Sequence, residues 1–255
     1  MTDFASALRA GEPVAGTWLS IGDPAVAEIA AGAGFDFAVI DTEHSSAGLE
    51  NVENQLRAIE AADGDTVPLA RVPWNDPVRI KRLLDTGPAG LVVPMVESAE
   101  AAREAVRAMR YPPEGIRGMA TSRASDYTRG FVDYVESAND DLLTIVQIES
   151  ERGVDNAADI AAVDGVDALF VGPSDLSGAV GTFPDTDDPE MVEAVEAVTA
   201  AAADAGVPVG TLTVDADEAD TWLDRGMDFL VVGYDVAFVS DGADEALSTY
   251  RDALD

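Results

Sequence analysis

The chain has 255 residues, 47% of them hydrophobic, which suits either a single α/β barrel or two smaller domains. It carries 49 acidic and 15 basic residues, a formal net charge of −34, and such a surface would repel nucleic acid and anionic membranes. The lack of cysteine excludes disulfides and thiolate metal sites, and without a membrane-length apolar run or a signal-peptide pattern we expect a cytoplasmic protein.

Eight short apolar runs recur along the chain, and most are followed by a segment with helical character. Because the runs are nearly continuous in Val, Ile, Leu, Phe and Ala, they are typical of parallel strands buried on both faces. We predict strands over residues 14–19, 35–41, 67–72, 90–96, 142–149, 167–172, 207–212 and 228–233. We predict helices over residues 24–33, 49–62, 77–86, 99–109, 153–162, 190–205 and 216–225. A final helix is expected over about 236–254, with a break near Asp241 and Gly242.

The order of these elements predicts the fold. Eight strand–helix units in about 250 residues indicate a single-domain (β/α)₈ TIM barrel over residues 1–255. A doubly wound open sheet is the alternative, but no Gly-x-Gly-x-x-Gly follows the first strand. The longest irregular stretch, residues 111–134, we interpret as a lid or a subunit contact. Three helix starts carry a capping acid followed by a proline in the first turn, namely Asp23-Pro24, Asp76-Pro77 and Asp188-Pro189.

The acidic residues are spread over the whole chain and do not form a tail. Self-repulsion of this size destabilises a compact state in dilute salt, whereas counterions screen it to within about 3 Å at 1 M. The regular apolar runs argue against disorder as the explanation. We therefore interpret the charge as adaptation to a salty cytoplasm, and we expect the fold to depend on high salt.

Barrel enzymes place their chemistry at the carboxyl ends of their strands. Here the second strand ends in Asp41, Glu43 and His44, the only histidine of the chain. Imidazole, with an unperturbed pKa of about 6.5, suits proton transfer near neutrality, and the alternative is a solvated loop histidine. The other predicted strand ends hold Trp18, Arg71, Pro94, Gln147 to Glu149, Gly172 to Asp175, Thr211 and Tyr234.

Glu149 and Asp175 follow consecutive strands, which lie about 4.8 Å apart if they are neighbours. Two carboxylates at that spacing either repel each other or share a divalent cation. Oxygen ligands without cysteine or clustered histidine favour Mg²⁺ or Mn²⁺, with Co²⁺ and Zn²⁺ as alternatives. For Asp175 the competing interpretation is a cap of the helix that follows the sixth strand.

Arg71 ends a buried strand, where an unpaired charge is costly. Its planar fork suits a carboxylate or a keto oxygen, and the alternative is an internal salt bridge to Asp41 or Glu149. Lys81, the only lysine, is predicted to point outward from its helix, which argues against Schiff-base chemistry. Backbone N–H groups of the Gly172-Pro173-Ser174 segment precede a helix start and suit a small anion.

Several sequence blocks together resemble the HpcH/HpaI aldolase family of metal-dependent pyruvate aldolases, and the similarity covers almost the whole chain. The blocks are GAGFD at 32–36, IDTEH at 40–44, RVPWND at 71–76, VPMV at 93–96, RYPPEGIRG at 110–118, QIE at 147–149 and VGPSDLS at 171–177. Two departures, at residues 119–122 and at Tyr234, fall where the aldehyde acceptor would lie, so they put acceptor specificity in doubt.

The resemblance implies a role for each strand-end residue. His44 would be the acid/base, Arg71 would bind the keto acid, and Glu149 with Asp175 would hold the metal. Backbone near Gly172 and Ser174 would receive the pyruvate carboxylate, with Pro173 and Trp18 also against the substrate. A carboxylate should support His44, and both Asp41 and Asp85 are candidates. The resemblance further implies a homo-oligomer, a hexamer built from dimers that exchange their C-terminal helices.

From these residues and the resemblance we predict a carbon–carbon lyase. It would reversibly cleave a 4-hydroxy-2-oxo acid to pyruvate and an aldehyde through a pyruvate enolate, with the metal as Lewis acid. One alternative is a decarboxylase or lyase of a related oxo acid that uses the same enolate. Another is a non-catalytic barrel that only binds a keto acid. A phosphate-handling barrel isomerase is disfavoured, because no glycine-rich anion loop follows the seventh strand.

Overall fold

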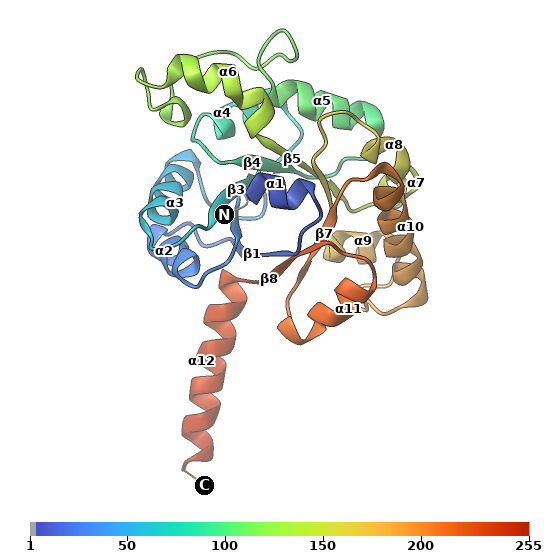
Figure 1. The fold of residues 1–255 in the computed structure, drawn as a ribbon. Coiled ribbons are helices and arrows are strands. Elements are labelled where there is room, and N and C mark those ends of the chain that lie inside the picture. The colour runs from blue at the N-terminus through green and yellow to red at the C-terminus, as the bar shows by residue number, and fades with distance from the viewer. Residues whose placement is uncertain (1–3, 255) are drawn as a thin grey trace.

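A computed structural model describes residues 4–254, and its eight parallel strands close into a barrel in chain order, β1 to β8 (Figure 1). Each strand therefore pairs with its neighbours in sequence, and β8 closes the ring against β1. This confirms the (β/α)₈ prediction and excludes the open sheet. The strands are β1 (Val14–Leu19), β2 (Phe37–Asp41), β3 (Val67–Arg71), β4 (Gly90–Val93), β5 (Leu143–Ile148), β6 (Ala168–Val171), β7 (Val209–Thr213) and β8 (Phe229–Tyr234).

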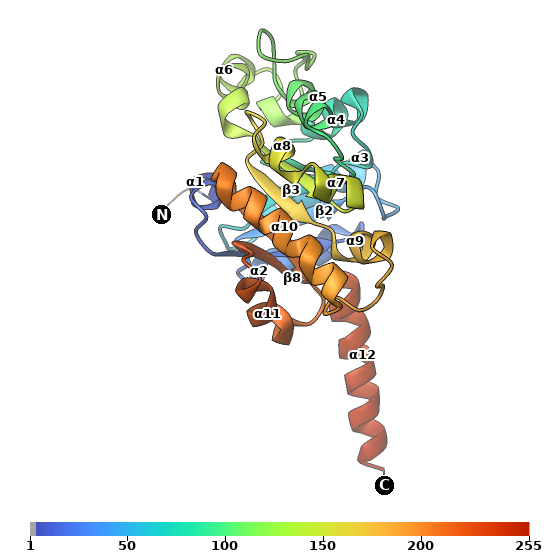
Figure 2. The ribbon, with the colours of Figure 1, turned by 90° about the vertical axis from the view of Figure 1, so that its right-hand side faces the viewer.

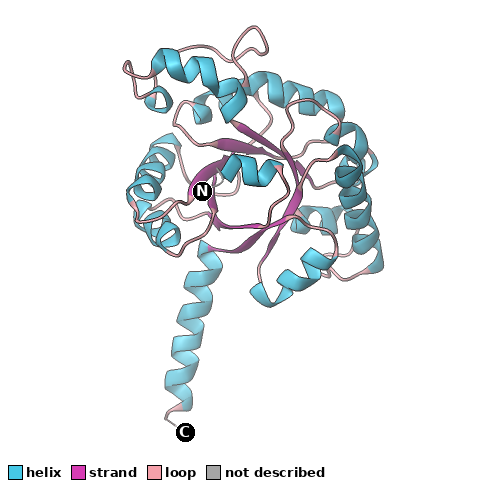
Figure 3. Cartoon of the chain, viewed as in Figure 1, coloured by secondary structure: helices cyan, strands magenta, loops and turns pink. Residues whose placement is uncertain are grey.

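Helices surround the barrel on its outside (Figure 3). Those that match predicted segments are α2 (Pro24–Gly32), α3 (Leu49–Ala61), α4 (Pro77–Leu84), α5 (Ala99–Met109), α10 (Pro189–Ala205) and α11 (Ala219–Asp224). The segment predicted over 153–162 is two short helices, α7 (Glu151–Asp155) and α8 (Ala157–Ala161). The predicted caps also form, since Asp23, Asp76 and Asp188 each accept a backbone N–H of the first helical turn.

Several helical segments were not predicted. They are α1 (Phe4–Arg9), α6 (Phe131–Asp141) and the 3₁₀ turn η1 (Arg123–Ser125). The helix α9 (Pro173–Ala179) is the one expected after the sixth strand, and the 3₁₀ turn η2 (Ala216–Glu218) lies within the helix predicted over 216–225. The helix α6 begins inside the stretch that we expected to be irregular, and it buries only Ala138, so its apolar periodicity is too weak to read. The helix α1 and the turn η1 are too short for a periodic signal, because a helical stripe needs about two turns to appear.

The predicted break in the last helix is wrong, since α12 (Asp235–Asp252) continues through Asp241 and Gly242. A single glycine costs a helix only about 1 kcal/mol relative to alanine, and the residues on either side outweigh that cost. Figures 1 and 2 show α12 projecting away from the barrel. It buries only Asp235 and Ala237, both near its start. Among residues 4–254 no helix has the length and apolar character needed to cross a bilayer.

The core has two shells, because alternate strand residues face opposite sides of the barrel wall. Outward-facing residues such as Ile40 and Val146 pack under the helices. Inward-facing aromatic rings fill the barrel, with the ring of Phe37 against that of Phe229 at a centroid distance of 6.1 Å. Glycine stands opposite these rings, and a Cβ at Gly210 would overlap the ring of Phe229. The barrel is therefore filled, and a ligand has room only at its ends.

Candidate active site

A pocket opens at the carboxyl ends of the strands, where the sequence predicted the chemistry. It brings together eight of the predicted residues with three further ones. The predicted residues are Trp18, His44, Arg71, Glu149, Gly172, Pro173, Ser174 and Asp175, and the others are Gln147, Phe170 and Leu212. Gln147 was recognised only as part of a strand end, although it lies on β5 two residues before Glu149, a spacing that turns both side chains to the same side.

Arg71 is held by a buried ion pair between two adjacent strands of the barrel. Asp41 on β2 lies in register with Arg71 on β3. The Nε of Arg71 donates to Oδ1 of Asp41 at 2.9 Å and its Nη2 donates to Oδ2 at 2.6 Å. The guanidinium also lies over the ring of Trp18, 4.8 Å from its centroid. Of the two internal salt bridges considered from sequence, the one to Asp41 is formed, and its geometry fixes the orientation of the fork.

The charge of Arg71 acts in turn on Asp41. Burial alone would raise the pKa of this carboxyl, but the hydrogen bonds and positive charge of Arg71 outweigh it and lower the pKa below its usual value. Asp41 is therefore ionised at neutral pH, and the pair is a lasting part of the site.

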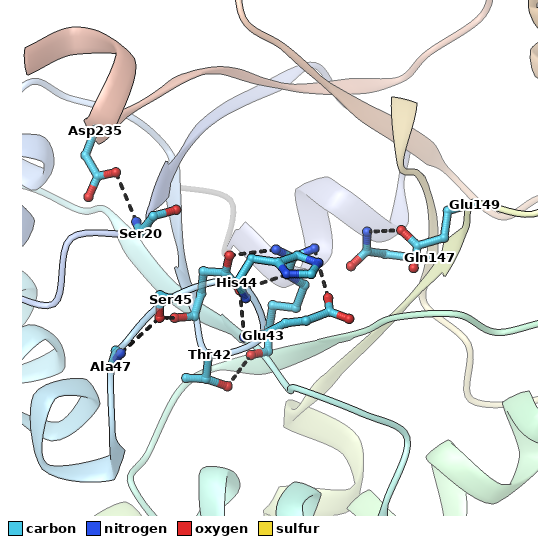
Figure 4. A network of polar contacts seen from close by, with 11 residues as sticks. Ser20, Thr42, Glu43, His44, Ser45, Ala47, Gln147, Glu149 and Asp235 are labelled. Atoms are coloured by element: carbon cyan, nitrogen blue, oxygen red, sulfur yellow. Dashed lines mark hydrogen bonds and ion pairs between the residues drawn. The ribbon is translucent and has the colours of Figure 1, made fainter. Parts of the chain in front are cut away.

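His44 sits on a loop that the same residues tie down (Figure 4). Oδ1 of Asp41 accepts the backbone N–H of His44 at 3.4 Å. The hydroxyl of Thr42 donates to the carbonyl of Arg71 at 2.6 Å, and the hydroxyl of Ser45 donates to the carbonyl of Asp41 at 2.5 Å. The side chains of Thr42 and Ser45 thus hold the loop in place, while the imidazole of His44 lines the pocket.

The two carboxylates proposed to support His44 lie in different places. Asp41 positions the backbone of the His44 loop, as described above. Asp85 is the residue at which α4 ends, outside the pocket of its own chain, and its Oδ1 accepts from Nη2 of Arg117 at 3.1 Å. Among the described residues neither carboxylate hydrogen-bonds the imidazole of His44. Within one chain, then, Asp41 acts on His44 through the backbone and Asp85 does not reach it.

Glu149 is buried, and each of its oxygens accepts one hydrogen bond. Oε1 accepts the backbone N–H of Met95 at 2.7 Å, and Oε2 accepts Nε2 of Gln147 at 2.9 Å. Met95 has a φ of +53°, a left-handed backbone that turns its N–H toward Glu149. The pKa of Glu149 is raised to about 7, chiefly by burial and also by the negative charges of Asp175 and Glu43. The N–H of Met95 and the positive charge of Arg71 lower the pKa but do not offset this rise.

These features fit a divalent cation. Glu149 and Asp175 line one pocket, the charge on Glu149 is destabilised there, and Oε1 of Gln147 is buried without a hydrogen-bond partner. Hard oxygen donors of this kind suit Mg²⁺ or Mn²⁺. In residues 4–254 no three His, Asp or Glu side chains are grouped to hold a metal. The chain would therefore supply two carboxylates and leave the other positions to water or substrate.

The segment from Gly172 to Asp175 lies against Glu149 at the start of α9. The helix is capped by Gly172 without a side-chain bond, so Asp175 lies inside the first turn and is not the cap, contrary to the alternative considered above. A Cβ at Gly172 would overlap Oε2 of Glu149. Glycine is required here so that the buried carboxylate can approach the backbone that faces the pocket.

Tyr234 and residues 119–122, where the sequence departs from its expected pattern, do not line this pocket in a single chain. A larger cavity lies at the opposite end of the barrel, beside Arg9 and Arg110. Arg9 is already paired there with Asp167 at 2.7 Å. Because barrel chemistry sits at the carboxyl ends of the strands, the smaller pocket is the candidate active site.

Comparison with known proteins identifies the family. The profile of the HpcH/HpaI aldolase/citrate lyase family matches residues 15–241. The chain belongs to this family. Membership confirms the resemblance inferred from the sequence blocks and the prediction of a carbon–carbon lyase.

Individual relatives are similar over nearly their full length. The 4-hydroxy-2-oxo-heptane-1,7-dioate aldolase of Shigella sonnei is 43% identical over 247 residues, covering 96% of this chain and 93% of that protein. The hydroxypyruvate/pyruvate aldolase of Roseovarius nubinhibens is 40% identical over 250 residues, covering 97% and 96%. A crystal structure of a family member from Burkholderia cenocepacia superposes with a TM-score of 0.93 at 39% identity, covering 98% of this chain and 100% of that one.

The overlap at Gly172 predicts a selective loss of metal affinity. We expect Gly172→Ala to displace Glu149 and weaken Mn²⁺ binding at least 10-fold, measured by calorimetric titration or by Mn²⁺ resonance. Gly178→Ala is the matched control, because a Cβ at that position of α9 meets nothing within 4 Å. Equal Mn²⁺ affinity in the two variants would contradict the steric argument.

The raised pKa of Glu149 predicts how the stability of the metal-free protein depends on pH. A carboxyl whose pKa is 4.5 in the unfolded chain and about 7 when folded contributes stability below pH 4.5, and that stability is lost as the pH rises through 7. The shift corresponds to about 3 kcal/mol. Glu149→Gln should remove this dependence, so that with chelator in molar KCl its melting temperature exceeds that of the parent at pH 8 but not at pH 4.5. Parallel melting curves across this range would contradict the assignment.

Proposed function

We propose that this chain is a divalent-metal-dependent aldolase that reversibly cleaves a 4-hydroxy-2-oxo acid to pyruvate and an aldehyde. The observation that carries the proposal is the convergence of His44, Arg71, Glu149 and Asp175 on one pocket at the carboxyl ends of the strands. The names of the two relatives, both aldolases at 40% identity or more over nearly the whole chain, support the same reaction type.

In this proposal His44 takes the proton of the C4 hydroxyl. The C3–C4 bond then breaks, the aldehyde leaves, and the electron pair of the bond becomes the pyruvate enolate. Arg71 faces the developing negative charge with its orientation already set by Asp41, so little reorganisation is needed. Trp18 and the backbone from Gly172 to Ser174, with Pro173 between them, would bound the keto acid.

Glu149 and Asp175 would hold the metal, and Gln147 would keep one oxygen of Glu149 in place. When bound, a divalent cation supplies Lewis acidity to the 2-keto group. Mg²⁺ or Mn²⁺ suits this set of oxygen ligands, and Co²⁺ or Zn²⁺ would be weaker matches to it.

The proposal predicts that the protein exchanges the methyl protons of pyruvate for deuterium, since the enolate forms in the reverse direction as well. We expect exchange by NMR in molar KCl with Mg²⁺ or Mn²⁺, and none after chelation. His44→Ala should slow cleavage roughly 100-fold or more. Exchange that survives exhaustive chelation would overturn the metal role. Pyruvate binding without any exchange would instead favour the non-catalytic barrel, and analysis of products would identify an oxo-acid decarboxylase.

We also propose that α12 packs against a second copy of the chain, as expected for a homo-oligomer with exchanged C-terminal helices. The helix leaves the barrel after its first turn and carries exposed apolar residues along its length, among them Phe238, Val239, Leu247 and Tyr250. An apolar stripe on a projecting helix requires a partner surface to bury it.

The oligomer proposal predicts that Val239→Asp combined with Tyr250→Asp shifts the assembly toward single chains in sedimentation velocity at molar KCl. Asp244→Asn, on the same helix, is the control and should leave the assembly unchanged. A parent protein that sediments as a single chain would contradict the proposal.

A further inference from the structure

Asp235 is a buried carboxylate that does not line the pocket, and the proposed reaction gives it no role. It is the first residue of α12, directly after β8, and it is 3% exposed. Its Oδ1 accepts the backbone N–H groups of Ser20 at 3.0 Å and Val236 at 2.8 Å, and its Oδ2 accepts that of Ile21 at 2.7 Å. One side chain thus joins the start of α12 to the loop that follows β1 (Figure 4). Hydrogen bonds to a charged group are stronger than neutral ones, so their loss is costly.

These bonds lie where the regular pairing of the barrel becomes irregular. The strands β1 and β8 pair in one register up to Gly16 opposite Val231, and the register then shifts by one residue so that Trp18 lies opposite Tyr234. Such a shift leaves a residue unpaired and bends the strand that carries it. At this closing seam, between the carboxyl ends of β1 and β8, the contacts of Asp235 hold what the ladder no longer fixes.

The first turn of α12 is fastened to the same seam in a second way. Gly233, in the shifted part of β8, has a φ of +78°, and a Cβ there would overlap the ring of Phe238 on α12. The hydroxyl of Thr17 on β1 donates to the carbonyl of Gly233 at 3.3 Å. A movement of the start of α12 is therefore passed to the end of β1 through Gly233 and Asp235.

The pocket residue that such a movement reaches is Trp18, which stands two positions before Ser20 on β1. Its ring lies 5.8 Å from that of Phe170 and 4.8 Å from the guanidinium of Arg71, and all three side chains line the pocket. Trp18 is 5% exposed, and a closely packed interior transmits displacement. A shift of Ser20 would therefore move one wall of the pocket.

We propose that Asp235 is a positioning residue that links the packing of α12 on a second copy of the chain to the placement of Trp18 in the pocket. The link rests on the proposed function, because it takes Trp18 as a wall of the keto-acid site and α12 as part of an interface. When α12 packs on a second copy, its direction is fixed, and the carboxylate at its first residue passes that constraint to the loop after β1. Without that packing, the first turn of α12 can shift and Trp18 shifts with it.

The placement of Trp18 can be followed without any measurement of activity. The chain holds three tryptophans, and in protein labelled with 5-fluorotryptophan the variant Trp18→Phe identifies the ¹⁹F resonance of Trp18. In 1 M KCl we expect this resonance to shift in Asp235→Asn, because the amide nitrogen would face a backbone N–H that the carboxylate accepts. The resonance of Trp74, on the loop after β3, should stay in place.

The kinetics separate positioning from a purely structural role. In the pyruvate exchange assay with saturating Mn²⁺, Asp235→Asn should raise KM about 10-fold and lower kcat less than about 3-fold, as expected when a wall of the site moves and the proton-transfer groups do not. Asp228→Asn is the matched control. Asp228 accepts the backbone N–H of Val209 at 2.9 Å at the opposite end of β8, so its variant should leave KM unchanged even where its melting temperature falls.

The dependence on assembly is tested with the double variant Val239→Asp/Tyr250→Asp, which leaves Asp235 intact. As a single chain it should shift the Trp18 resonance and raise KM about as much as Asp235→Asn does. When Asp235→Asn is added to the double variant, KM should change by less than about 2-fold further, because the link is already broken. The double variant keeps the test valid even if Asp235→Asn does not fold.

The outcomes distinguish the link from the function on which it rests. If Asp235→Asn leaves both the Trp18 resonance and KM as in the parent, or if its effect on KM multiplies with that of the double variant, the link is wrong while the aldolase proposal stands on exchange by the parent. If the parent exchanges no pyruvate, the aldolase proposal is wrong and the Trp18 resonance alone decides the link. A parent that sediments as a single chain overturns the link whatever its activity.

Discussion

The ion pair between Asp41 and Arg71 is the interaction on which the rest of the site depends. It joins two neighbouring strands at their carboxyl ends, sets the plane of the guanidinium, and lowers the pKa of Asp41 so that the pair stays charged. The same two residues also anchor the loop that carries His44. A buried pair of this kind is weak evidence for stability, since desolvation offsets much of the attraction. Its value here is orientation.

Around that pair the site is short of positive charge. Glu43, Glu149 and Asp175 stand within range of one guanidinium, and burial raises the pKa of both glutamates. The protein holds Glu149 in this unfavourable state with the N–H of Met95 and the amide of Gln147. Such strain is common at functional sites, where a ligand compensates for it. A bound divalent cation would restore the balance.

The acidic surface is a separate matter from the acidic site. A formal charge of −34 spread over the whole chain acts at long range and is screened at high salt, whereas contacts of about 3 Å within the pocket are not. The projecting helix α12 adds exposed apolar side chains, among them Phe238 and Val239. Salt that screens repulsion between copies of so acidic a chain would also favour their association.

The barrel and most of its site followed from the sequence alone. Continuous apolar runs separated by helical segments determine a parallel sheet, and in a parallel barrel all carboxyl strand ends meet at one rim. For that reason Trp18, His44, Arg71, Glu149 and Asp175 could be placed together without coordinates. A short helix such as α1 could not be predicted, because it lacks a full apolar period.

Only the tertiary structure decided which groups touch. Whether Arg71 pairs with Asp41 or Glu149 depends on strand register, which sequence spacing does not specify. Asp85 lies apart from His44 because α4 runs away from the pocket and ends at Asp85. The contact of Gly172 with Glu149 depends on how closely β5 and β6 approach each other. The sequence thus determined which chemical groups reach the rim. Their pairing, and with it the pKa of each carboxyl, is set by distances of a few ångströms between segments far apart in the chain.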